Sequence, residues 1–86
     1  MAAVTVYTTD PCSFCLRAKQ LLDARGIEYD EINLAKDPAG RTELLARTGM
    51  MSFPQVLVGD ELIGGFQETL AADRSGRLAE MLKAAA

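Results

Sequence analysis

Apolar and polar residues alternate at the start of the chain and then change to a helical spacing. Residues 4–8, Val-Thr-Val-Tyr-Thr, alternate β-branched and aromatic side chains, which predicts a strand. From residue 12 to about residue 25 the apolar positions recur every three or four residues, which predicts a helix. We expect Pro11 in the first turn of this helix, where a missing N–H is tolerated, and Gly26 at its left-handed end.

The same alternation of strand and helix returns in the next part of the chain. Residues 27–34 predict a second strand, whose acidic side chains we assign to a solvated edge of the sheet. Asp37 and Pro38 suit the N-cap and the first position of a second helix, and Gly49 suits its end.

Four apolar side chains near this second helix are assigned to the interior. Leu44 and Leu45 are expected to form its buried stripe. Met50 and Met51 follow in a loop, and we expect them to fill gaps in the core, as flexible methionines usually do.

The last third of the chain predicts a hairpin and a final helix. Residues 55–58 begin directly after Pro54, a position where strands tolerate proline, and residues 61–63 return after a Gly-Asp turn. A helix then runs to about residue 83 with an interruption at Ser75-Gly76. The order β-α-β-α-β-β-α predicts an α/β fold with two parallel strands first and a hairpin that makes the sheet mixed.

Composition narrows the class of protein. The 86 residues are 49% hydrophobic and 24% charged, which predicts one soluble globular domain over residues 1–86. The net charge of −3 and the lack of a basic block argue against nucleic acid as a partner. No apolar run is long enough to cross a membrane, and the start lacks the features of a signal peptide, so we expect a cytoplasmic protein.

Cys12 and Cys15 are the only cysteines and lie at the junction of the first strand and helix. In a first helical turn they would share one face, close enough for a disulfide. Unpaired amides and the helix dipole would favour the Cys12 thiolate and lower its pKa below about 8.5. Cys15, deeper in the helix, should be more protected, which suggests an attacking and a resolving thiol.

Other uses of the two thiols are less favoured. The chain has no histidine, which excludes a Cys–His nucleophile and the usual four-ligand zinc site within one chain. A structural disulfide over so short a loop would add only about 2 kcal/mol to the stability. Redox chemistry is the leading interpretation, and a shared metal or cluster site and an inert disulfide are the alternatives.

Three segments together resemble the glutaredoxin family. The segment from Val6 through the cysteine pair to Lys19 is similar to its active-site segment, in which an aromatic residue precedes the second cysteine. Ser52-Phe53-Pro54 resembles the family's Thr-Val-Pro segment with a cis proline, and Ile63-Gly64-Gly65 its di-glycine before the last helix. The resemblance covers residues 3–83 and implies a thioredoxin-like fold, with a four-stranded mixed sheet flanked by helices.

The resemblance also implies the roles of the site residues. Cys12 would attack a disulfide and Cys15 would resolve the mixed disulfide. The amides that open the last helix would bind the γ-glutamyl carboxylate of glutathione, and Glu68 its amino group. The structural alternatives are core packing for Phe14, a simple hairpin exit for Gly64-Gly65 and a plain helix-start carboxylate for Glu68. The implied contacts with glutathione are Phe14, Phe53, Pro54, Gly65, Phe66, Gln67 and Glu68.

The chain departs from the family pattern at several positions. No lysine precedes Cys12, and Met50-Met51 is apolar where a basic or amide residue commonly holds the glycyl carboxylate. Arg47 is the nearest candidate to replace it, and Ser13 stands where the active-site tetrapeptide usually has proline. We therefore expect weaker glutathione binding and an altered redox poise.

The leading functional hypothesis is a glutathione-dependent thiol–disulfide oxidoreductase that reduces protein disulfides or glutathione mixed disulfides. Glutathione would be the co-substrate of a monomeric enzyme without a tightly bound cofactor or metal. One alternative is a redoxin recharged by thioredoxin reductase. A second is a [2Fe–2S] cluster bridged by two chains through Cys12 and two glutathiones, and a third is an interaction module with vestigial thiols.

Overall fold

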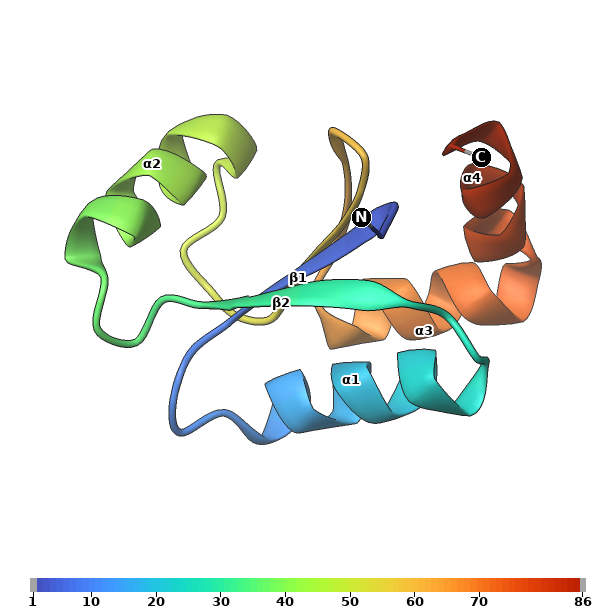
Figure 1. The fold of residues 1–86 in the computed structure, drawn as a ribbon, viewed down its shortest axis with the longest axis horizontal. Coiled ribbons are helices and arrows are strands. Elements are labelled where there is room, and N and C mark those ends of the chain that lie inside the picture. Colours follow the sequence, from blue (N-terminus) through green and yellow to red (C-terminus); the bar gives the residue numbers. More distant parts are fainter. Residues whose placement is uncertain (1, 86) are drawn as a thin grey trace.

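The computed structural model describes residues 2–85, which form four strands and four helices (Figure 1). In chain order these are β1 (Val4–Thr8), α1 (Ser13–Ala24), β2 (Tyr29–Asn33), α2 (Pro38–Thr48), β3 (Gln55–Val58), β4 (Glu61–Gly64), α3 (Phe66–Ser75) and α4 (Arg77–Ala85). Gly76 separates the last two helices in a left-handed conformation, so the predicted interruption is confirmed. Within this part of the chain no helix is both long and apolar enough to cross a membrane.

The strands form one mixed sheet in the order β2-β1-β3-β4. β1 and β2 are parallel, with Val4 opposite Tyr29, whereas β3 is antiparallel to both β1 and β4. This topology confirms the predicted crossover followed by a hairpin, and the thioredoxin-like fold. Figure 1 shows α1 and α3 together on one side of the sheet and α2 on the other.

The core lies between the sheet and the pair α1 and α3. β1 alternates buried and half-buried residues, as expected of a strand with one fully covered face. Small and branched side chains allow the helices to approach the strands closely. The buried cluster consists of Val4, Val6, Ala18, Leu22, Val56, Val58, Ile63, Ala72 and Leu78.

The residues predicted to begin and end α2 are confirmed, whereas the predicted start of α1 is wrong. Asp37 caps α2 by accepting a hydrogen bond from the N–H of Gly40 at 2.9 Å, and Gly49 closes it with a φ of 74°. α1 begins only at Ser13, because Cys12 has an extended backbone and occupies the N-cap itself. Pro11 therefore precedes the cap and is not in the first turn.

Two of the predicted core side chains face solvent. Leu44 is buried, but Leu45 is 37% exposed. Leu44 is the one buried residue of α2, because the rest of the fold covers only a narrow strip of this helix. Met51 is 80% exposed and fills no gap in the core. Both predictions depended on residue type, which does not reveal how much of a helix or loop the neighbouring elements cover.

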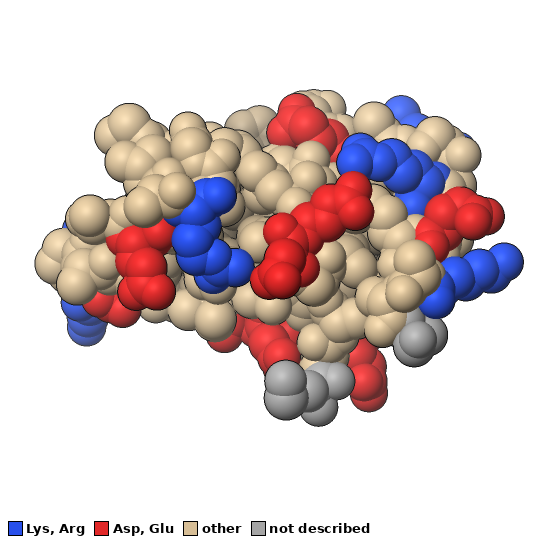
Figure 2. Space-filling model, turned by 90° about the horizontal axis from the view of Figure 1, so that it is seen from above, with Lys and Arg blue, Asp and Glu red and all other residues tan. Residues whose placement is uncertain are grey.

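Charged side chains of both signs are interspersed on the molecular surface. Figure 2 shows Lys and Arg lying among Asp and Glu on the face seen from above, without a continuous basic area. One of the ion pairs joins the end of α1 to α3. Arg25 donates two hydrogen bonds of 2.9 Å to the two carboxylate oxygens of Asp73.

This ion pair predicts a pH-dependent contribution to stability. The hydrogen bond from Arg25 holds the pKa of Asp73 below its usual value. The pair therefore stabilises the fold above the unfolded-state pKa of about 3.9, and the contribution is lost as the pH falls through the lowered folded-state pKa. Arg25→Gln should reduce the urea midpoint of unfolding at pH 7 and reduce it less at pH 2.

The matched control is Arg77→Gln, which removes an exposed pair with Glu61 at 3.4 Å. Such a pair contributes little, so the midpoint should not change measurably at either pH. An equal loss at pH 7 and pH 2 for Arg25→Gln would mean that the arginine acts through packing.

Candidate redox site

Cys12 is the N-cap of α1, Cys15 lies in its first turn, and the two are joined by a disulfide. Their Cα atoms are 5.2 Å apart, within the range that a disulfide requires. Cys12 is half-buried, whereas Cys15 is only 3% exposed. The sulfur of Cys12 is therefore the more accessible one for a reacting molecule, and Cys15 is shielded from solvent.

The sulfur of Cys12 takes the place of the side-chain oxygen in an ordinary N-cap. The backbone N–H of Cys15 points to Cys12 Sγ at a distance of 3.1 Å. The free amides at the start of α1 and the positive end of its dipole favour negative charge at this point. After reduction the same geometry stabilises a thiolate on Cys12.

A backbone carbonyl approaches the disulfide from the loop before β3. The carbonyl oxygen of Phe53 lies 3.8 Å from Cys12 Sγ, and the Phe53–Pro54 peptide bond is cis. The cis bond agrees with the expectation from the family resemblance. The backbone of Phe53 therefore lies beside the reactive sulfur, where an extended chain bonded to Cys12 can pair with it.

A shallow hollow of about 140 Å³ is lined by Phe53, the residue whose carbonyl lies beside Cys12 Sγ. Phe14 lines it with 46% of its surface exposed, and its ring stacks on that of Phe66 at a centroid distance of 6.0 Å. Core packing of Phe14, the structural alternative, is thus wrong. The structure brings together around this hollow all seven residues expected to contact glutathione: Phe14, Phe53, Pro54, Gly65, Phe66, Gln67 and Glu68.

The start of α3 supplies the polar part of the hollow. Glu68 accepts a hydrogen bond of 2.7 Å from the N–H of Gly65 and so stabilises the first turn of the helix. The N–H groups of Phe66 and Gln67 have no acceptor within the helix, as at every helix start. The hollow thus offers two amide donors beside a carboxylate.

Gly64 cannot carry a side chain without disturbing this helix start. Its φ is 131°, and an added Cβ would lie 2.8 Å from Glu68 Cβ. We expect Gly64→Ala to lower the free energy of unfolding by about 2 kcal/mol. Gly59→Ala, where φ is 59° and the space is open, should lower it by only about 1 kcal/mol in the same urea titration. If the two substitutions lowered the free energy of unfolding equally, the contact of the added Cβ with Glu68 would have no energetic cost.

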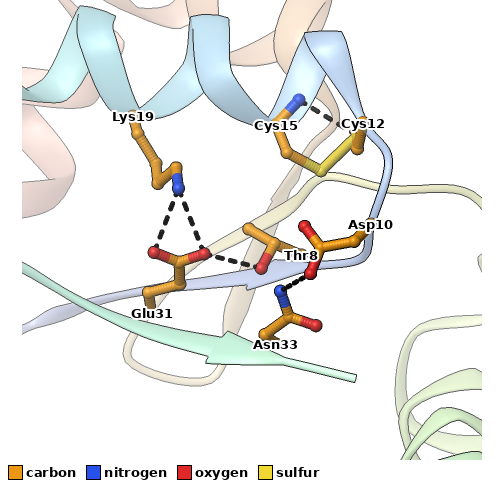
Figure 3. A network of polar contacts seen from close by, with 7 residues as sticks. All are labelled: Thr8, Asp10, Cys12, Cys15, Lys19, Glu31 and Asn33. Carbon is orange, nitrogen blue, oxygen red and sulfur yellow. Dashed lines mark hydrogen bonds and ion pairs between the residues drawn. A yellow bond between two sulfur atoms is a disulfide. The ribbon is translucent and has the colours of Figure 1, made fainter. Parts of the chain in front are cut away.

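A polar network behind the cysteines was not predicted (Figure 3). Thr8 Oγ1 donates to Glu31 at 2.8 Å, and Lys19 Nζ lies 3.1 and 3.2 Å from the two carboxylate oxygens of the same residue. Asn33 donates to Asp10 at 2.9 Å, just before the cysteine pair. The network ties α1 and the loop before it to the edge strand β2.

The acidic side chains of β2 lie on an exposed edge strand, as predicted, and Glu31 in addition takes part in this network. Glu31 stands opposite Val6 in the parallel pairing, which places its carboxylate within reach of Thr8 and Lys19. The signal that would have revealed this role is the strand register, which the sequence pattern alone does not specify.

The family pattern has a basic or amide residue before the cis proline, and this chain lacks it; Arg47 does not take its place. It lies on α2 and its guanidinium donates to the hydroxyl of Tyr7 at 3.2 Å, and it does not line the hollow beside Cys12. The loop in front of Phe53 presents Met50 and Met51 instead.

Comparison with known proteins gives one consistent result. The family model of glutaredoxin matches residues 4–63. The chain is 38% identical over 84 residues to a glutaredoxin of Pseudomonas aeruginosa, covering 98% of this chain and all of that protein. It is 36% identical over 83 residues to glutaredoxin 3 of Escherichia coli K12, covering 96% of this chain and all of that protein.

Solved structures agree with these sequence relatives. The structure of a buckwheat glutaredoxin–glutathione complex superposes with a TM-score of 0.87 at 31% identity, covering 98% of this chain and 79% of that one. The solution structure of a glutaredoxin from Brucella melitensis gives a TM-score of 0.82 at 37% identity, covering 96% of this chain and 90% of that one.

Proposed function

Because this chain belongs to the glutaredoxin family of thiol–disulfide oxidoreductases, we propose that it reduces protein disulfides and glutathione mixed disulfides with electrons from glutathione. The observation that carries the proposal is the position of Cys12 Sγ. It caps α1, lies 3.8 Å from the carbonyl oxygen of Phe53, and is bonded to the more protected Cys15.

In the proposed reaction on a glutathionylated protein, the Cys12 thiolate attacks the sulfur of the glutathione moiety. The protein–glutathione disulfide breaks, and the protein thiolate leaves and takes up a proton. A second glutathione thiolate then attacks the glutathione sulfur held on Cys12. This step releases glutathione disulfide and restores the Cys12 thiolate.

In the proposed reaction on a protein disulfide, Cys12 attacks one of its sulfurs and releases the other as a thiol. The Cys15 thiolate then attacks the Cys12 sulfur, forms the Cys12–Cys15 disulfide and releases the second protein thiol. Two glutathione molecules reduce this disulfide in turn and leave as glutathione disulfide.

Glutathione would bind in the hollow beside Cys12. The backbone of Phe53 would pair with its cysteine residue, and the amides of Phe66 and Gln67 would bind its γ-glutamyl carboxylate. Glu68 would hold the amino group with the carboxylate oxygen that Gly65 leaves free. The neighbouring buckwheat structure, a glutaredoxin–glutathione complex by its own description, supports this placement.

A steady-state assay tests the proposal and its alternatives. The mixed disulfide of glutathione and 2-mercaptoethanol is reduced either with glutathione and glutathione reductase, or with thioredoxin reductase. Turnover with the first couple supports the proposal, and turnover only with the second supports the redoxin alternative. No turnover with either overturns both, and visible absorbance after anaerobic reconstitution with iron and sulfide would support the cluster alternative.

We further propose that residues 1–86 act as a single monomeric domain in a cytoplasm that keeps glutathione reduced. The expected partners are disulfide-containing or glutathionylated proteins, and no bound metal or further cofactor takes part.

A further inference from the structure

One ion pair of the polar network behind the cysteines has no part in the proposed reaction steps (Figure 3). Lys19 Nζ lies 3.1 Å from a carboxylate oxygen of Glu31, with 27% and 33% of the two side-chain surfaces exposed. The other carboxylate oxygen accepts a hydrogen bond of 2.8 Å from the hydroxyl of Thr8, which is only 1% exposed. The pair is therefore held at a fixed, partly covered place between α1 and the sheet, where salt screens its charges less than on an open surface.

Lys19 lies on the same side of α1 as the two sulfurs. It follows Cys15 by four residues, so the two side chains are neighbours on the helix surface. Along the helix axis Lys19 is about 6 Å from Cys15 and about 10 Å from Cys12. Figure 3 shows the Lys19 side chain and the disulfide on the side of α1 that faces β1 and β2. A charge at this place therefore acts on the thiols across a short distance.

Reduction of the disulfide creates a charge at the start of α1. Two glutathione molecules each give up one electron and one proton and join as glutathione disulfide. The sulfur–sulfur bond breaks, Cys15 takes up one proton, the other proton goes to solvent, and Cys12 stays a thiolate at the N-cap. The oxidised site is neutral, whereas the reduced site carries one negative charge. A nearby cation thus favours the reduced form, and a nearby anion favours the disulfide.

We propose that the Lys19–Glu31 ion pair adjusts the reduction potential of the Cys12–Cys15 disulfide. The carboxylate of Glu31 alone would disfavour the Cys12 thiolate, and the ammonium group of Lys19 offsets this effect. The two charges are 3.1 Å apart, much less than the distance of about 10 Å to Cys12, so they nearly cancel at the sulfurs while both are present. This inference rests on the disulfide chemistry of the proposed function and adds what controls its equilibrium.

Other charged side chains around the sulfurs also contribute to the potential. Asp10 precedes Cys12 by two residues, and Glu68 lies at the start of α3. The guanidinium of Arg17 lies over the ring of Phe14, 5.4 Å from its centroid. The test therefore compares variants that leave these three charges in place and change only the ion pair.

The measured quantity is the equilibrium constant for reduction in glutathione redox buffers at pH 7. The protein is incubated without oxygen at several ratios of glutathione to glutathione disulfide, its thiols are alkylated, and mass spectrometry counts them. Lys19→Met leaves the Glu31 carboxylate unbalanced and should lower the constant about three-fold, which corresponds to about 14 mV. Glu31→Gln leaves the Lys19 ammonium unbalanced, keeps an oxygen that accepts from Thr8, and should raise the constant about three-fold.

Three further variants are the controls. Arg25→Gln removes a positive charge from the same helix and breaks the ion pair with Asp73. It should leave the constant unchanged, because Arg25 is about 20 Å from Cys12 along the axis, beyond the screening length of about 10 Å at 0.1 M salt. Lys19→Arg keeps the charge and should give the parent value. The double variant Lys19→Met/Glu31→Gln removes both charges and should return to the parent value.

The outcomes separate this inference from the proposed function. Opposite shifts that shrink at 1 M salt, where the screening length falls to about 3 Å, support the inference. Shifts in the same direction for both single variants, or no shift in either, overturn it and leave the proposed function intact if the parent disulfide exchanges with glutathione. A parent disulfide that does not exchange with glutathione overturns the proposed function and this inference with it.

Discussion

Cys12→Ser is expected to lower the rate of disulfide reduction by roughly 10³-fold or more, on every substrate and with every reductant. A serine hydroxyl at the N-cap still accepts the N–H of Cys15, so the helix start is retained. It cannot form the mixed disulfide, however, because the thiolate is the nucleophile of the reaction. The measurement is the steady-state rate with glutathione and glutathione reductase, together with circular dichroism to verify the fold.

Cys15→Ser is the matched control, because it removes the second thiol and leaves the first. This variant should still reduce glutathione mixed disulfides, which require only Cys12, but lose most of its activity on intramolecular protein disulfides. Full activity of Cys12→Ser, or loss of both activities in Cys15→Ser alone, would contradict the assignment of attacking and resolving thiols.

The second large effect is expected at Gln55, which joins β3 to the loop before it. Replacing Gln55 with methionine keeps the volume but leaves the carbonyls of Met50 and Ser52 without their donor, whereas the hydroxyl of Thr48 can still donate to the carbonyl of Leu44. Buried polar groups left unpaired cost about 1–3 kcal/mol each, so we expect a loss of about 3–5 kcal/mol in the free energy of unfolding. Urea denaturation measures it.

The redox reaction should suffer as well, because the loop carries Phe53 and its carbonyl beside Cys12. We expect kcat/KM for the small mixed disulfide to fall about ten-fold at a temperature where the variant is folded. Thr48→Val removes one partner of Gln55 and the acceptor of the Met50 N–H but keeps both carbonyl contacts of Gln55, and it should cost about 1–2 kcal/mol. A loss for Gln55→Met no larger than that of Thr48→Val would show that the two carbonyls find other donors.

Local signals in the sequence predicted the elements whose ends are set by neighbouring residues. Asp37, Pro38 and Gly49 bound α2 as expected, because caps depend on side chains and backbone angles within a few residues. The hairpin of β3 and β4 and the break at Gly76 were predicted for the same reason. The family resemblance, not the periodicity, supplied the cis bond at Pro54.

Features that depend on contacts distant in sequence were missed. The exposure of Met51 is set by hydrogen bonds from Gln55, and the role of Glu31 by the pairing of β1 with β2. The start of α1 was misplaced because cysteine is not an ordinary capping residue. The sulfur of Cys12 caps the helix, whereas Pro11 was expected to lie in the first helical turn. In each case the feature depends on a contact made by a polar group, a backbone group or a sulfur atom. The pattern of hydrophobic residues carries no information about such contacts.

The outer position of β2 has a consequence for how these molecules behave in a crowded solution. Its free side offers unpaired backbone groups to any passing strand, which is how many small β-containing proteins stick together. Asp30 places a negative charge on that edge, and a charged side chain on an edge strand disfavours pairing with a strand of another copy. The outer edge of β2 is thus protected against strand addition between copies, while the face that carries the two sulfurs lies on another element, at the start of α1.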